Sequence, residues 1–402
     1  MMRLGSALVA CTPAPSAPAE PPASPEVVER DFTPVAPMRP EEALVLSTNH
    51  MAFVQRGDGG KTARLQIGRR MADGRLSWST HDDPGVRVSF GAARWRGGFL
   101  SWGAEEARVN AWQFDGGGWR STPAFLGDWP SVHDGVMDTV VDTLGERWAA
   151  GTYDHGHIIV GQVDGKVVQT APAQAVEGAK VSSVEWLDVD ADGDEDLLVA
   201  RARGLRGEVG DILLYVDGDV AKAPQIVWTA DDWFTRELRL FDADGDGMLD
   251  VVGLRPGLEQ KGAKRGEVHA AGAQLVRFDR STVPWAPKPL AVLPAPLCHS
   301  ATVADVVPGG PSELILGCTH KGLYVVHPGA EVRVEAVDAE ADHATHPVVA
   351  FDVDGDGVLE IVHAAMQDPP IGAYQWAPEG WRRSPVVPVE PKRVAFSLAA
   401  IR

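Results

Sequence analysis

The sequence predicts an all-β protein, a seven-bladed β-propeller of four-stranded blades, with six and eight blades as the alternatives. From residue 41 onward no helical periodicity is sustained. A pair of apolar-alternating strands joined by a turn recurs seven times, and an acidic motif followed by a short apolar run occurs three times. Repeats spaced by about 42 to 62 residues are typical of propeller blades.

The N-terminal segment has the features of an exported lipoprotein. Arg3 precedes a short apolar run that ends in Leu8-Val9-Ala10-Cys11, which resembles the bacterial lipobox. The resemblance implies that residues 1–10 are a signal peptide and that Cys11 carries a lipid, although ten residues is short for such a peptide. Residues 11–40 are rich in Pro, Ala and Ser and are expected to form an extended tether. Residues 41–402 are expected to form the propeller.

Seven turns mark the predicted outer hairpins of the blades. They lie at Asp73-Gly74, Asp115-Gly116, Asp164-Gly165, Asp217-Gly218, Asp279-Arg280, Pro328-Gly329 and Pro378-Glu379-Gly380. Gly and Asp are common turn residues because they tolerate the required backbone angles. The tail 393–401 is expected to be an extra strand that completes blade 1 and closes the ring, which would remove exposed sheet edges.

Three acidic loops are predicted between strands 1 and 2 of blades 4, 5 and 7. Counted from the first acid as offset 0, they carry carboxylates at offsets 0, 2, 4 and 8 and a glycine at offset 5. The ligands expected from side chains and from the offset-6 carbonyl are Asp188, Asp190, Asp192, Asp194 and Asp196; Asp242, Asp244, Asp246, Met248 and Asp250; and Asp352, Asp354, Asp356, Val358 and Glu360. Oxygen-only ligands in a flexible loop favour calcium, about three ions in all. A solvated acidic turn is the alternative, and three copies in register disfavour it.

These loops resemble those of the FG-GAP/VCBS repeat family, the calcium-binding blades of integrin α-subunit-like propellers. An EF-hand is disfavoured because apolar strand-like runs, not helices, follow each final acid. The family resemblance implies that the face opposite the calcium loops carries the ligand site.

A degenerate fourth loop begins at Asp305 and keeps only offsets 0, 5 and 8. Cys298 and Cys318 flank it. If its strands form a hairpin in which Ala304 faces Leu314, the two cysteines lie nearly opposite, so an exported protein is expected to form a disulfide there.

The opposite face is expected to gather histidines, aromatic residues and basic side chains. Ten of the twelve histidines map to it, His363 among them, and a basic cluster that includes Arg201 is placed in the 2–3 loops. The candidates for ligand binding are Trp129, His133, Arg203, Arg206, Trp233, Arg255, Lys264, Arg265, His299, His343 and His346.

The formal charge of −19 argues against nucleic-acid and anionic-membrane binders, and three Ca²⁺ would bring it to −19 + 6 = −13. The expected function is a non-catalytic binding module for protein or polysaccharide at the bacterial cell envelope, with an anionic ligand among the candidates. The protein is expected to contact a membrane only through its N-terminal lipid. The expected location is the outer membrane, facing the periplasm or the cell surface.

Two alternatives remain open. A carbohydrate-active enzyme would use His299, His343 and His346 with Asp134 or Asp342, and no Gly-x-Ser-x-Gly motif is present. A scaffold component without a small ligand is the other.

Overall fold

The computed structural model describes residues 43–401 with internal gaps, the longest at 51–62, 128–135, 258–271 and 340–347. The predicted signal peptide, Cys11 and the tether therefore lie outside the described residues. Within the described part, no helix is long and apolar enough to cross a membrane.

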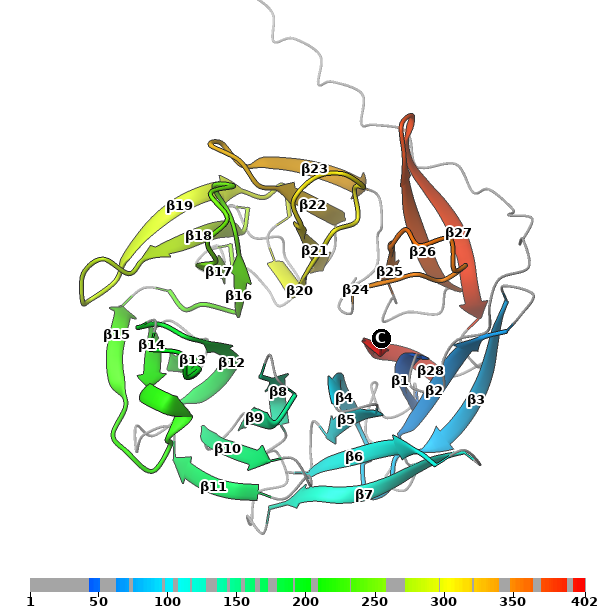
Figure 1. Ribbon diagram of the computed structural model, residues 1–402, viewed down its shortest axis with the longest axis horizontal. Coiled ribbons are helices and arrows are strands. Elements are labelled where there is room, and N and C mark those ends of the chain that lie inside the picture. Colours follow the sequence, from blue (N-terminus) through cyan, green and yellow to red (C-terminus); the bar gives the residue numbers. More distant parts are fainter. Residues whose placement is uncertain are drawn as a thin grey trace, which may run out of the picture.

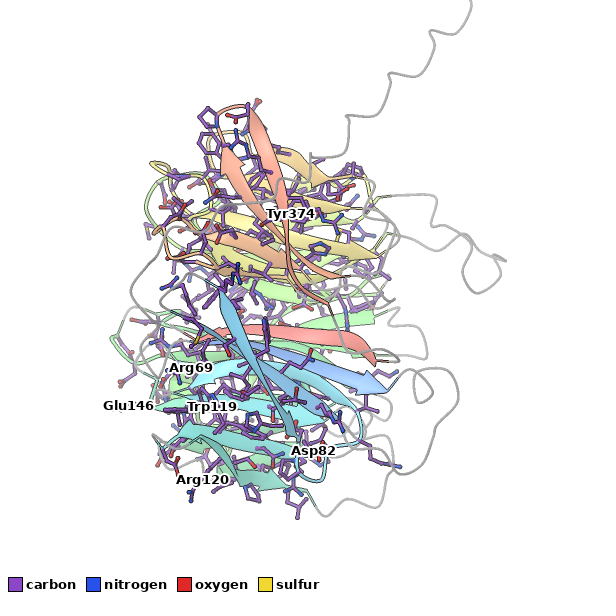
Figure 2. All side chains as sticks on the ribbon, turned by 90° about the vertical axis from the view of Figure 1, so that its right-hand side faces the viewer. Arg69, Asp82, Trp119, Arg120, Glu146 and Tyr374 are labelled. Atoms are coloured by element: carbon purple, nitrogen blue, oxygen red, sulfur yellow. A yellow bond between two sulfur atoms is a disulfide. The ribbon has the colours of Figure 1, made fainter. Side chains whose placement is uncertain are left out.

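The described strands form seven four-stranded antiparallel sheets arranged around a central axis (Figure 1). Figure 2 shows the same ring from the side, with the sheets stacked face against face. The prediction of an all-β propeller with four-stranded blades is confirmed.

Each sheet runs from an innermost strand at the axis to an outermost strand at the rim. In that order, blade 1 contains β28 (Arg393–Ile401), β1 (Ala43–His50), β2 (Arg64–Arg70) and β3 (Leu76–Asp82). Blade 2 contains β4 (Ser89–Trp95), β5 (Gly98–Gly103), β6 (Arg108–Phe114) and β7 (Trp119–Leu126). Blade 3 contains β8 (Val136–Val141), β9 (Arg147–Thr152), β10 (His157–Gln162) and β11 (Val167–Pro172). Blade 4 contains β12 (Lys180–Leu187), β13 (Asp196–Arg203), β14 (Val209–Tyr215) and β15 (Gln225–Ala230), with the 3-10 turn η1 (Val216–Gly218) after β14.

The remaining three blades follow the same order. Blade 5 contains β16 (Glu237–Phe241), β17 (Asp250–Arg255), β18 (Gln274–Asp279) and β19 (Ala286–Val292). Blade 6 contains β20 (Leu297–Ala304), β21 (Glu313–Thr319), β22 (Leu323–His327) and β23 (Arg333–Asp338). Blade 7 contains β24 (Val348–Phe351), β25 (Glu360–His363), β26 (Pro370–Ala377) and β27 (Gly380–Pro388). Each predicted hairpin turn falls between the third and fourth strands of its blade.

The C-terminal strand closes the ring, as predicted. β28 pairs antiparallel with β1 over eight residue pairs, from Ala43 opposite Ile401 to His50 opposite Arg393. The innermost strand of blade 1 therefore comes from the end of the chain and the other three from its beginning. This arrangement couples the two ends of the described chain, and β28 pairs with the inner edge of β1 that would otherwise be unpaired.

The hydrophobic core is divided among the gaps between neighbouring blades. One cluster joins Leu198 and Ile212 of blade 4 to Val251 and Phe278 of blade 5. A second joins blade 5 to blade 6, and further clusters join blades 1 and 2, 2 and 3, 3 and 4, and 6 and 7. Both faces of the sheets of blades 2 to 6 are thus buried, which explains why their second and third strands read as continuous apolar runs.

The hairpin of β20 and β21 corrects the predicted register by one residue. Ala304 faces Glu313, not Leu314, and a bulge between Cys298 and Ser300 shifts the pairing so that Cys298 faces Cys318. The two cysteines form the predicted disulfide. The bulge inserts one extra residue into β20, and this residue shifts the pairing so that the two cysteines lie directly opposite each other.

Candidate metal loops and ligand face

The three acidic loops join strands 1 and 2 of blades 4, 5 and 7, as the sequence predicts. They connect β12 to β13, β16 to β17 and β24 to β25. Because these connections occupy equivalent positions in their blades, the loops lie on one face of the ring. The outer hairpin turns lie on that face too.

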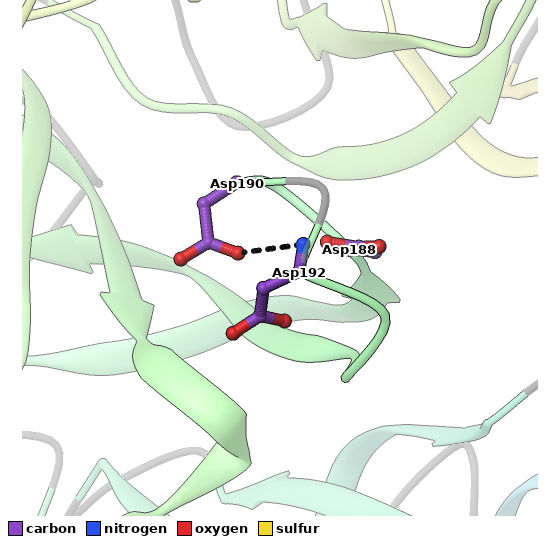
Figure 3. Close-up of side chains that lie close together, drawn as sticks. All are labelled: Asp188, Asp190 and Asp192. Atoms are coloured by element: carbon purple, nitrogen blue, oxygen red, sulfur yellow. Dashed lines mark hydrogen bonds between the residues drawn. The ribbon is translucent and has the colours of Figure 1, made fainter.

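Three carboxylates converge within each loop. One oxygen from each of Asp188, Asp190 and Asp192 lies within 4.8 Å of the others, and the same holds for Asp242, Asp244 and Asp246 and for Asp352, Asp354 and Asp356. Figure 3 shows the blade 4 group, where the Asp192 N–H donates to Asp190 Oδ1 at 3.3 Å. These are the acids at offsets 0, 2 and 4.

The outer hairpin of blade 4 adds a further acid to its loop. Asp217, in η1, brings a carboxylate oxygen within 4.8 Å of those of Asp192 and Asp194. The sequence places Asp217 only in a turn, and its approach to the loop depends on the pairing of β13 with β14.

The backbone of each loop wraps around its first acid. The N–H of the offset-5 glycine donates to Oδ2 of that acid, from Gly193 to Asp188 at 3.1 Å, from Gly247 to Asp242 at 2.9 Å and from Gly357 to Asp352 at 3.2 Å. These glycines adopt φ of 99°, 88° and 88°. No atom would contact an added Cβ within 4 Å, so glycine is required for its backbone conformation and not for space.

The acid at offset 8 closes the loop through the backbone. Asp196 Oδ2 accepts the N–H of Val189 at 3.0 Å, Asp250 Oδ2 accepts that of Ala243 at 3.2 Å, and Glu360 Oε2 accepts that of Val353 at 2.7 Å. From the sequence we predicted only a metal-binding role for these three acids. In the structure, one oxygen of each accepts the N–H of the residue at offset 1, and we call this hydrogen bond the loop clamp.

The degenerate loop of blade 6 keeps the loop clamp. Glu313 Oε2 accepts the N–H of Val306 at 3.0 Å and that of Val307 at 3.3 Å, and burial raises the pKa of Glu313. This explains why offset 8 persists where offsets 2 and 4 are lost. The presence of an acid at offset 8 in the degenerate loop is the feature of the sequence that could have indicated a structural role for this position.

The blade 4 loop contains a carboxylate oxygen suited to a cation. Asp188 Oδ1 is buried and has no hydrogen-bond partner among the described residues. Burial also raises the pKa of nearby Asp196, with a smaller contribution from the charges of Asp190 and Asp192. A buried carboxylate oxygen without a donor is costly, and a hard cation held by oxygen ligands would satisfy it.

Arginines approach the loops in three different ways. Arg277 of β18 donates to the carboxylates of Asp244 and, at 3.3 Å, Asp250. Arg70 of β2 donates to the Asp352 carbonyl at 2.9 Å and lies 3.4 Å from its carboxylate. Arg147 of β9 donates to backbone carbonyls at the blade 4 loop, that of Glu195 at 3.2 Å and that of Asp217 at 3.0 Å.

Two ligand-face candidates, Trp233 and Arg255, are brought together. The Arg255 guanidinium lies 4.9 Å from the ring centre of Trp233, which packs against Trp228 and Phe278 at centroid distances of 4.5 and 6.3 Å. Trp233 is therefore half-buried between blades 4 and 5, with a cation over its ring. It extends the inter-blade core on the side away from the acidic loops.

Two predicted members of that face are buried instead. Arg201 lies inside β13, 2% exposed, and donates to Asp211 at 2.5 Å. His363 ends β25 and is 4% exposed. The strands extend further toward this face than the sequence suggested, and they take both side chains into the inter-blade core.

The other ligand-face candidates are not described in the structure. Trp129, His133, Asp134, Arg206, Lys264, Arg265, Asp342, His343 and His346 lie outside the described residues, and only the backbone of Arg203 and His299 is described.

The fold of the chain is shared with solved structures of very different sequence. A protein from Lactobacillus plantarum matches with a TM-score of 0.57 at 12% identity, covering 90% of this chain and 99% of that one. The Dos1 propeller matches with a TM-score of 0.54 at 10% identity, covering 91% and 90%. The chain is a β-propeller. No family model and no curated protein matches the sequence, and at these identities the likeness shows the fold alone.

Proposed function

We propose that the protein is a calcium-stabilised propeller that binds a protein or polysaccharide through the face opposite its acidic loops. The observation that carries the proposal is the convergence of three carboxylates in each of three equivalent loops. Their spacing resembles that of FG-GAP/VCBS repeats. Bound calcium would offset the repulsion among these acids and fix the turn between strands 1 and 2.

The described part of the face opposite the loops includes a pair of side chains suited to binding a ligand. On the face opposite the loops the chain places the Arg255–Trp233 pair, and the polar groups found buried nearby serve packing. Arg201 is held by Asp211, and Thr229 donates to the same carboxylate at 2.8 Å. Propellers present loops from several blades on one rigid face, which suits recognition of an extended partner.

Two assays in calcium-containing buffer test the ligand class with the chain from residue 41 onward. One measures binding of the protein to a glycan array, and the other measures capture of envelope proteins by the immobilised protein. Saturable binding that Arg255→Ala weakens would support the proposal. The matched control is Arg120→Ala, which removes an exposed arginine paired with Asp115 on the outer hairpin of blade 2. Release of shortened glycan would favour the carbohydrate-active enzyme, and no binding by either assay would contradict a ligand-binding role.

We further propose that the protein is held at the bacterial cell envelope by a lipid on Cys11, with the Pro-rich segment as tether. Only a cysteine thiol accepts the lipid, so Cys11→Ser should move the protein from the membrane fraction to the soluble fraction. Wild-type protein that is soluble and retains residues 1–10 would contradict this assignment.

A further inference from the structure

In the blade 5 loop, a basic side chain from outside the loop engages two of the loop carboxylates. Arg277, on β18, contacts Asp244 and Asp250, the acids at offsets 2 and 8. The pairing of Val252 opposite Arg277 fixes the position of this arginine in the sheet. Its side chain is 26% exposed, and those of Asp244 and Asp250 are 39% and 23% exposed.

The equivalent position carries no charge in the other two blades. Two residues after the offset-8 acid, Leu198 faces Leu214 in blade 4, and Val362 faces Ala373 in blade 7. Neither apolar side chain can donate to a carboxylate. At this position of the third strand, blade 5 therefore has a positively charged side chain, whereas blades 4 and 7 have apolar ones.

We propose that Arg277 competes with the divalent cation for the blade 5 loop and weakens calcium binding there. The inference rests on the proposed calcium binding. The guanidinium neutralises the acids when calcium is scarce, and calcium must displace it from Asp244 Oδ2 before that oxygen can coordinate. The donated hydrogen bonds are charge-assisted and the groups are half-buried, so displacement has a cost.

Arg147 differs from Arg277 because its contacts beside the blade 4 loop are to backbone oxygens. It donates to the carbonyls of Glu195 and Asp217 at 3.2 and 3.0 Å, and it pairs with Asp142 at 3.2 Å. Arg70 donates to the Asp352 carbonyl of the blade 7 loop at 2.9 Å and lies 3.4 Å from the carboxylate of the same residue. We therefore expect calcium to bind more weakly at the blade 5 loop than at the blade 4 loop.

The test isolates one loop at a time and titrates it with calcium chloride by calorimetry. Asp190→Ala with Asp354→Ala leaves the blade 5 loop intact. Adding Arg277→Leu, which copies the residue of blade 4, should tighten calcium binding about five- to tenfold. Arg277→Gln, which keeps the length but removes the charge, should give a gain in the same direction.

Arg147→Leu is the matched control, made in a protein whose blade 5 and blade 7 loops are disabled by Asp244→Ala and Asp354→Ala. It also removes one half-buried positive charge beside an acidic loop, with 27% of its side chain exposed, yet it should change blade 4 affinity by less than about twofold. An equal gain from Arg147→Leu would overturn the proposal, because it would reveal a general effect of charge.

A second readout separates the outcomes. Without calcium, Arg277→Leu should lower the melting temperature, and the rise on adding calcium should exceed that of the parent protein. A folded Arg277→Leu protein with unchanged or weaker affinity at blade 5 would contradict the role of Arg277 and leave calcium binding at the other loops intact. Wild-type protein that binds no calcium would instead overturn the proposed function, and this inference with it.

Discussion

In four of the described blades, a carboxylate at the end of the strand 1–2 loop holds that loop closed through a hydrogen bond to its backbone. The loop clamp occurs in blades 4, 5 and 7 and also in blade 6, whose loop lacks the acids at offsets 2 and 4. It thus separates two roles that the sequence pattern combines. Offsets 0, 2 and 4 gather charge for a cation, and offset 8 satisfies a backbone amide.

The clamp predicts a calcium-independent loss of stability in blade 6. Glu313→Ala leaves the amides of Val306 and Val307 without their acceptor, so the free energy of unfolding should fall by about 2 kcal/mol. Glu313→Gln keeps one carbonyl oxygen and should lose less. Urea denaturation measures both, with and without calcium; a loss that calcium abolishes would contradict the clamp.

His363 illustrates how burial changes the role of a residue type. Both ring nitrogens lack hydrogen-bond partners among the described residues, and the ring lies 5.2 Å from that of Tyr374. The Tyr374 hydroxyl, on the labelled side chain in Figure 2, donates to Asp338 at 2.6 Å. Burial, with a smaller contribution from Arg383, lowers the pKa of His363 to about 4.

This shift predicts a specific pH dependence of stability. Between about pH 6.5 and 4 the unfolded chain takes up a proton at His363 and the native protein does not. The free energy of unfolding should therefore fall as the pH drops through this range, by up to about 3 kcal/mol. His363→Leu should remove this part of the slope in urea titrations at several pH values. Identical slopes for the two proteins would contradict the assignment.

Arg277 shows the limit of prediction at the residue scale. The acids of the blade 5 loop are visible in the sequence, because their spacing is local. Arg277 lies on β18, the strand after the one that begins at Asp250, and the register of β17 with β18 brings the two side chains together. Register depends on bulges and turn geometry, which the local pattern does not reveal.

At the scale of elements, the β20–β21 hairpin combines a weakened acidic loop with a covalent link. The bulge at His299 in β20 places Cys298 opposite Cys318, and the two are bonded. The sequence predicted the pair and placed the register one residue away. Alternation of apolar residues locates a strand well, but a single inserted residue changes every facing pair beyond it.

The disulfide predicts a measurable stabilisation of blade 6. Its sequence separation is 20 residues, so reduction, or replacement of both cysteines by alanine, should lower the free energy of unfolding by about 3 kcal/mol. Comparing oxidised and reduced protein by urea denaturation tests this, with the double alanine variant as the control that reductant should not affect. Both thiols found free by mass spectrometry of protein from its native envelope would contradict it.

At the scale of the whole molecule, closure of the ring depends on residues from both ends of the described chain. β28 pairs with β1, and the inner strands of successive blades surround the axis (Figure 1). Arg239 of β16 links three of these strands, donating to the Ala301 carbonyl of β20 at 2.7 Å and to Glu185 of β12 at 3.1 Å. Closure was predictable because the tail is a strand with no sequential partner.

The face opposite the loops was the part that the sequence predicted least well. Its composition indicated exposed basic and aromatic groups, yet Arg201 and His363 are buried and Trp233 packs between blades. A polar residue at a strand end can face solvent or enter an inter-blade core, and composition does not distinguish these outcomes. Repeat spacing, by contrast, follows directly from the architecture of a propeller.

The stoichiometry of calcium binding tests the central claim most directly. Equilibrium dialysis of the chain from residue 41 onward should find about three calcium ions per wild-type chain, two in Asp244→Ala and none in the triple variant Asp190→Ala, Asp244→Ala and Asp354→Ala. Calcium should also raise the melting temperature of the wild type by mass action. Absence of bound calcium in the wild type, or equal binding by the triple variant, would contradict the account.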